Sequence, residues 1–182
     1  MKIEDKTRRV IILCQSFARN FAYYRSGHDV DARKLLDPSR PDSQFWLEVN
    51  GNFIDKCVLE WCKIFDDKKG HQHWTKVVKN CDEFEAGLLC AVGVNSDEFK
   101  VFAGEMRQYR DKFVAHLDNL PTMCIPKLDV AIASVRHLHN YLAAHEAGLA
   151  TLAGLTTNQD DFDKGLDQCI CGAKQVYDRA IS

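Results

Sequence analysis

The stretch SDEFKVFAGEMRQYRDKFVAH, residues 96–116, says most about how this chain folds. Its apolar side chains recur at steps of three or four residues, which is the spacing of one face of an α-helix. Ser96 is expected to cap the N-terminus, because acidic residues follow it in the first turn. The stretch therefore predicts one long amphipathic helix over residues 96–116. Its apolar stripe consists of Phe99, Phe102, Met106, Tyr109 and Phe113.

The same periodicity recurs on both sides of this stretch, and no alternating pattern typical of a strand reaches a convincing length. We expect long helices over about residues 4–24, 43–65, 126–149 and 160–181, and shorter ones over about 73–79 and 82–92. Phe45 and Trp61 are expected on the buried side of the second helix, and Val176 and Tyr177 on that of the last. Polar segments with proline separate several of these elements. The chain is thus predicted to be all-α, an up-and-down helical bundle with additional short helices, in a single domain over residues 1–182.

Composition limits the classes of function. The 182 residues are 46% hydrophobic and 27% charged, which is typical of a globular domain, and the net charge is −2. That charge excludes a bulk electrostatic attraction to nucleic acid, so RNA binding would need a local basic patch. No run approaches the roughly 18 apolar residues of a membrane span, and the charged start does not resemble a secretory signal. We expect a cytoplasmic protein that does not contact membranes.

Eight cysteines are present, an even number that raises the question of disulfides. Most lie within apolar helical runs, where cysteine behaves as a small hydrophobic residue, so we expect reduced thiols and no structural zinc. His71 and His73 with Cys81 form a weak metal-site candidate, because no second pair has matching spacing. Cys169 and Cys171 lack the two-residue spacer of redox and zinc motifs, so one is expected to pack and the other to be peripheral.

Two further groups of polar residues are more simply explained as solvated surface. His137, His139 and His145 lie on the predicted helix over residues 126–149, where His137 and His145 share a face. The lysines between residues 68 and 79 form a modest basic cluster that could touch RNA. Both groups are expected to be exposed to solvent.

Arg110 and His116 flank the apolar stripe of the 96–116 helix. On a wheel of about 100° per residue, each falls about 60° from Phe113, on opposite sides, and Asp111 points almost directly away. The two differ by about 9 Å in height along the axis. One helix therefore brings them to a common phosphate only if their side chains lean together. Two copies packed on this stripe would bring four such groups to one cleft.

An arginine followed by a polar residue and, after four more residues, by a histidine at a helix end in an all-α domain resembles the HEPN superfamily. In this chain the three residues are Arg110, Asp111 and His116. The sequences RDKFVAHLD, residues 110–118, and WCKIFD, residues 61–66, look most like the AbiU-type abortive-infection branch. The similarity extends over about residues 53–118. The chain departs from the family at Asp111, where asparagine or histidine is common.

The resemblance implies a dimer that cuts RNA without a metal or other cofactor. In that chemistry the ribose 2′-hydroxyl attacks the adjacent phosphate. His116 is the expected general acid or base, since a free imidazole titrates near pH 6.5. Arg110 would neutralise charge on the phosphoryl oxygens, and Asp111 would orient one of the two, across the dimer.

The resemblance also indicates which neighbours would bind the substrate and what the protein would serve. Arg107, Tyr109 and Lys112 lie on the same segment and are expected to contact RNA. The setting implied is bacterial phage defence or stress, as in toxin–antitoxin systems, with an antitoxin or another protein as regulator.

The alternative is a helical domain without catalysis that binds protein or RNA on the same scaffold. An arginine and a histidine at the rim of an apolar stripe often do no more than pair with an acid or bond at a helix end. The two hypotheses differ in one observable feature. In the first, Arg110 and His116 face a shared open cleft, and in the second each is occupied by a local partner.

Overall fold

The computed structural model describes residues 2–115, 125–145 and 161–182, and for residues 113–115 the backbone alone. All regular elements within these ranges are helical, which confirms the prediction of an all-α bundle. Among the described helices, none has the length and apolar character needed to cross a bilayer. In chain order the elements are α1 (Ile3–Gly27), the 3₁₀ turn η1 (Ala32–Leu36), α2 (Ser43–Phe65), the 3₁₀ turn η2 (Trp74–Lys76), α3 (Cys81–Val92), α4 (Ser96–Tyr109), the π-helical segment η3 (Arg110–Ala115), α5 (Leu128–His145) and α7 (Asp161–Ile181).

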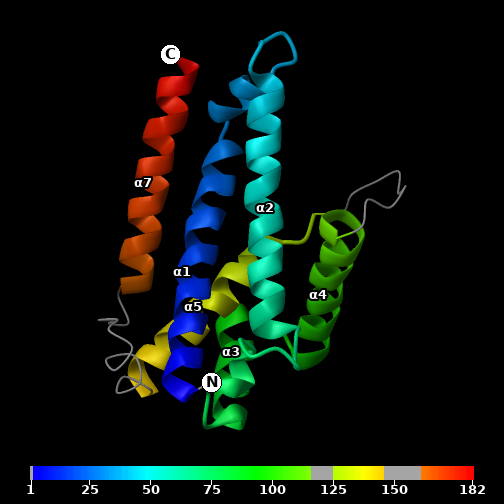
Figure 1. The fold of residues 1–182 in the computed structure, drawn as a ribbon, viewed down its shortest axis with the longest axis vertical. Helices are drawn as coiled ribbons and strands as arrows, with labels where there is room; N and C mark the ends of the chain where they lie inside the picture. Colours follow the sequence, from blue (N-terminus) through cyan, green and yellow to red (C-terminus); the bar gives the residue numbers. More distant parts are fainter. Residues whose placement is uncertain (1, 116–124, 146–160) are drawn as a thin grey trace.

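Helix α1 is the central helix of the three longest ones, α1, α2 and α7. It lies between α2 and α7, with α7 parallel to it and α2 antiparallel (Figure 1). Helix α5 crosses obliquely behind α1 and packs on α1 and α3, and α4 lies against α2 on the side away from α1 (Figure 1). Helix α4 continues directly into η3, and this arrangement brings η3 against α2, whose C-terminal end leads into a loop.

Trp61 is the residue on which α2, α4 and α5 meet. Its side chain is fully buried, and its ring lies 5.2 Å from that of Phe102 on α4, edge to face. On the other side its Nε1 donates a 2.8 Å hydrogen bond to Ser134 Oγ on α5, which satisfies the one polar atom of the indole. The predicted burial of Trp61 is therefore confirmed, and the same contacts fix where α4 lies.

The predicted element boundaries agree with the structure in most places. Helix α2 has the expected bounds, and α1 runs three residues beyond the expected Tyr24, to Gly27. The assignment of Ser96 as the cap is wrong. Asn95 is the cap, because its side chain accepts from the backbone N–H groups of Asp97 and Glu98 while Glu98 bonds back to the Asn95 N–H. Residues 146–149 and 160, which were predicted to be helical, lie outside the described residues.

Several burial predictions are wrong, and packing explains each. Phe45 is 60% exposed and Val176 is 56% exposed, because α2 and α7 are each covered mainly by α1 and turn these side chains outward. Of the three histidines expected at the surface, only His145 is exposed. His139 is buried and His137 is half-buried, because α1, α3 and α7 all pack on α5.

A close approach between α1, α2 and α7 depends on Gly27, the last residue of α1. Asn50 on α2 is buried and donates from Nδ2 to the Gly27 carbonyl oxygen at 3.4 Å. Its Oδ1 accepts a 2.6 Å hydrogen bond from the hydroxyl of Tyr177 on α7. A Cβ atom at Gly27 would collide with Asn50 Oδ1 and lie 2.6 Å from the Tyr177 hydroxyl oxygen. Only glycine lets this three-helix hydrogen-bond network form.

We therefore predict that Gly27→Ala destabilises the protein by about 1–3 kcal/mol, the usual cost of forcing atoms into a packed interior. Gly51→Ala is the matched control, since Gly51 is inside α2 and a Cβ there meets nothing within 4 Å. It should instead stabilise the protein by about 0.5–1 kcal/mol, because alanine favours the helix. Urea unfolding of both variants measures the difference. Equal effects of the two substitutions would contradict the proposed role of Gly27.

Candidate functional site

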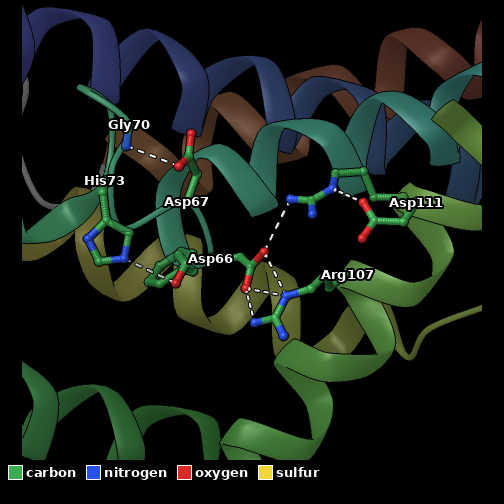
Figure 2. Close-up of polar contacts among 8 residues, drawn as sticks. Asp66, Asp67, Gly70, His73, Arg107 and Asp111 are labelled. Atoms are coloured by element: carbon green, nitrogen blue, oxygen red, sulfur yellow. Dashed lines mark hydrogen bonds and ion pairs between the residues drawn. The ribbon is translucent and has the colours of Figure 1, made fainter.

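The carboxylate of Asp66, directly after the end of α2, organises the charged residues of the predicted site. Its side chain is only 7% exposed. Arg107 on α4 donates from Nε to both carboxylate oxygens, at 3.0 and 3.1 Å, and also from Nη2 to Oδ1. Arg110 donates from Nη1 to Asp66 Oδ2 at 3.1 Å. One buried carboxylate thus binds two guanidinium groups, Arg107 from α4 and Arg110 from η3 (Figure 2).

Asp111 completes the arrangement by accepting a 2.8 Å hydrogen bond from Arg110 Nε, and this contact raises the pKa of Arg110. This contact is made within one chain, and the orientation of Arg110 or His116 by Asp111 across a dimer stays a prediction. Arg110 is 26% exposed at its side chain. A guanidinium carries five N–H donors, and among the described residues Nη2 of Arg110 has no partner. One edge of the group is therefore left for another acceptor.

The backbone that carries Arg110 is a π-helix, and this changes the geometry expected from the sequence. Helix α4 is regular to Tyr109, and η3 then continues from Arg110 to Ala115. In a π-helix the hydrogen bonds link residues five apart, so each turn holds more residues than an α-helical turn. The wheel at α-helical periodicity is therefore wrong beyond Tyr109. Segments of this kind occur frequently at functional sites.

The loop that follows α2 is built to hold Asp66 in place. The backbone N–H groups of Asp66 and Asp67 both donate to the Cys62 carbonyl oxygen, at 2.9 and 2.8 Å. Asp67 accepts from the Gly70 N–H at 3.0 Å, and a Cβ at Gly70 would collide with that carboxylate. His73 is buried, and its Nε2 lies 3.2 Å from the carbonyl oxygen of Phe65, the last residue of α2 (Figure 2).

The burial of the Asp66 side chain was not predicted, although the sequence contained a usable signal. An acidic residue at a helix C-terminus is disfavoured by the negative end of the helix dipole. Asp66 directly follows the apolar end of α2, so its carboxylate at this position indicates nearby cationic partners. Which cations would supply the pairing, Arg107 and Arg110, could be read only from the packing of α4 on α2. His73, which the sequence offered only as part of a weak metal-site candidate, is also buried.

The remaining predicted site residues lie in different environments. Tyr109 is buried and donates a 2.9 Å hydrogen bond to Asp55 Oδ1, so it faces the protein interior. Lys112 is partly exposed, and no contact with another described residue occupies its ammonium group. His116 lies outside the described residues. The exposed lysines at positions 68, 69, 76 and 79 remain at the surface, as expected.

The described residues offer neither a metal site nor a thiol nucleophile near this cluster. Across residues 2–115, 125–145 and 161–182, no group of three or more potential metal ligands comes together. The seven described cysteines are free thiols, with Cys169 half-buried and Cys171 exposed, as predicted, while Cys124 lies outside this set. Cys62 is near Arg110, but burial raises its pKa to about 12, which keeps the thiol protonated at neutral pH.

Comparison of the chain with family models, with curated proteins and with solved structures gives no match. The arrangement itself defines a helical domain with an arginine held between two carboxylates on a π-helical segment.

The pKa of His73 gives a test of the loop that supports Asp66. Burial lowers this pKa below its ordinary value, while the bond to Phe65 opposes the shift. Because its pKa is lowered, His73 binds fewer protons in the folded state than in the unfolded state. Its contribution to the free energy of unfolding is therefore fully present above about pH 6.5 and is lost as pH falls through the folded pKa. Burial shifts His137 and His139 in the same direction.

We therefore predict that the free energy of unfolding is lower at about pH 5.5 than at about pH 7.5. A His73→Gln variant should be less stable than the wild type at the higher pH and should lose less on acidification. His71→Gln is the control, because His71 is exposed and close in sequence. Urea titrations at both pH values, with an NMR titration of the imidazole protons, measure the effect. A wild-type stability that rises on acidification would contradict it.

Proposed function

We propose that this protein is a HEPN-like, metal-independent endoribonuclease of the AbiU-like kind, acting as a dimer in bacterial defence or stress. The observation that carries the proposal is the state of Arg110. Asp66 and Asp111 hold its Nη1 and Nε, and its Nη2 edge is uncommitted among the described residues. The group is thus oriented but not saturated, which suits recognition of a phosphate by a planar guanidinium. It lies six positions before His116, as in the HEPN motif.

The proposed reaction forms one bond and breaks one at phosphorus. The 2′-oxygen of the ribose bonds to the adjacent phosphorus as its proton passes to a base, and the bond from phosphorus to the 5′-oxygen breaks as that oxygen takes a proton from an acid. The products are a 2′,3′-cyclic phosphate and a 5′-hydroxyl. His116 of each subunit would supply the base and the acid. Arg110 would stabilise the charge that develops on the phosphoryl oxygens.

Asp66 has a definite part in this proposal. Because it is anchored by the end of α2 and the Asp67–His73 loop, it fixes the direction of the Arg110 guanidinium before substrate arrives. Such preorganisation lowers the cost of ordering the site in the transition state. Lys112 would add a positive charge next to this pair for the RNA backbone. Arg107 is tied to Asp66, and its proposed contact with RNA would use the exposed side of its guanidinium, which is 53% accessible at the side chain.

A non-catalytic interaction domain is the second candidate, and two observations favour it. Arg110 is bonded to the local partners Asp66 and Asp111, which is the state expected of Arg110 in such a domain. The charges of Arg107 and Arg110 are balanced by those of Asp66 and Asp111, so the cluster has no excess positive charge to attract RNA. A structural cluster of this kind would fasten η3 and α4 to α2 without any chemistry. In that case Arg110 contributes to stability, and its replacement affects folding rather than turnover.

The catalytic proposal predicts that the purified protein cleaves total RNA in EDTA and leaves 2′,3′-cyclic phosphate ends. His116→Ala should reduce the rate by about 10²–10⁴-fold, the usual contribution of general acid–base catalysis. Arg110→Ala should reduce it by about 10²–10³-fold, as expected when one donor to a developing charge is lost. Asp111→Asn should have a smaller effect, since an amide oxygen still accepts from Arg110. Mapping of RNA ends by sequencing, with rates from a gel assay, measures these changes.

His71→Ala and Arg179→Ala are matched controls, since both residues are exposed and distant in sequence from the motif. Both should cleave at the wild-type rate. Circular dichroism must show that the inactive variants are folded. Wild-type rates in His116→Ala and Arg110→Ala would refute the mechanism. A wild-type protein without activity, or variants inactive only because they unfold, would favour the interaction domain.

The proposal also predicts a two-fold dimer that brings the two η3 segments together, as the family resemblance implies. Light scattering at micromolar concentration should give a mass twice that of one chain. Disulfide crosslinking between subunits tests the geometry. Under mild oxidation, a cysteine introduced by Lys112→Cys should form a disulfide with the same cysteine of the second subunit. A cysteine introduced by Gly51→Cys on the exposed side of α2 should not. A strictly monomeric mass would contradict this part of the proposal.

A further inference from the structure

A groove on a different part of the molecule has the features of a small-molecule site. It lies over α1, between α2 and α7, and has a volume of about 510 Å³. That volume is within the range of pockets that hold drug-sized ligands, about 300–1,000 Å³. None of the described residues that line it is charged. The lining includes the aromatic side chains of Tyr23, Trp46, Phe53 and Tyr177, with Gln168 and Gly172 on α7, and the other lining residues are Val49, Cys169, Ala173 and Val176.

The aromatic walls are held from behind by hydrogen bonds. Trp46 Nε1 donates to Asp42 Oδ2 at 3.0 Å, and Asp42 is fixed in turn by two hydrogen bonds from Arg40, at 3.0 and 3.1 Å. The hydroxyl of Tyr177 donates to buried Asn50 at 2.6 Å. The rings of Trp46 and Tyr177 lie 5.4 Å apart. Because the walls are already ordered, a ligand would not have to pay for ordering them.

Two polar groups at the groove are uncommitted, while the others are in use. The hydroxyl of Tyr23 and the side-chain amide of Gln168 have no partner among the described residues. The polar atoms of Trp46 and Tyr177 are occupied by the internal bonds just described. Gly172 leaves the α7 side of the groove open, since a Cβ there would meet nothing within 4 Å. The groove is therefore a wide apolar slot with two hydrogen-bonding groups available.

From these features we propose that the groove binds a neutral, planar, aromatic small molecule. Flat aromatic faces suit ring stacking at the walls. A charged ligand would lose its hydration without gaining a counter-charge, because no charged side chain of the described residues lines the groove. Tyr23 and Gln168 would fix its orientation. The inference does not rest on the proposed ribonuclease activity, since none of these residues belongs to the Arg110 site.

Titration with N-phenyl-1-naphthylamine, a neutral aromatic dye that fluoresces in apolar surroundings, tests the proposal on the full chain. The wild type should show saturable binding of one dye per chain. Gly172→Leu places a side chain in the open side of the slot and should weaken binding by about tenfold or more. Gly165→Leu is the matched control, because Gly165 is also on α7, has open space at its Cβ and does not line the groove. It should bind like the wild type.

A second probe tests whether the groove selects neutral ligands or binds any molecule with an apolar ring system. The sulfonated analogue 8-anilinonaphthalene-1-sulfonate has the same ring system with a negative charge and should fail to displace the neutral dye at equal concentration. The proposal is overturned if the dye does not saturate, if Gly172→Leu binds it as the wild type does, or if the sulfonate competes equally. It is also overturned if Gly172→Leu lowers the mass in light scattering, which would make the groove an interface between two copies.

Discussion

The burial of Trp61 is the constraint on which the rest of this structure depends. Its ring is the contact surface for α4, and its single polar atom reaches α5, so the placement of both helices is fixed by one side chain of α2. Burying a large aromatic ring with its polar atom satisfied is among the strongest single contributions a core can receive. Phe65, one turn further along α2, stacks on Trp61 and extends this surface towards the end of the helix.

The placement of α4 has an electrostatic consequence at that end. Once α4 lies on α2, its last turn and the π-helical segment face Asp66, and two arginines reach one buried carboxylate. A carboxylate beyond the negative end of a helix is unfavourable by itself, so the cluster is stable only as a unit. Arg110 therefore cannot be considered separately from Asp66. The orientation of the Arg110 guanidinium in η3 is set by Asp66 at the end of α2.

Helix α2 takes part in both of the unusual features of the molecule, at different points along its length. Its first turns carry Trp46 and Phe53, which face the groove beside α7, and its end carries Asp66. The first feature is uncharged and aromatic, and the second is a balanced set of ions. The two features are suited to different ligands. Both are built on α2, which packs against α1 along most of its length and against α4 near its end.

The sequence by itself determined the helices, because apolar residues at three- and four-residue steps can be buried together only in a helix. The bounds of α2 and the stripe of Phe102, Met106 and Tyr109 follow from that spacing. It also singled out Arg110 and Asp111, through resemblance to a known motif. Only the tertiary structure decided that Asp66 pairs with Arg110, that Phe45 faces solvent and that His139 is buried. These outcomes depend on which faces of neighbouring helices meet, and a contact between residues 44 positions apart leaves no periodic trace in the chain.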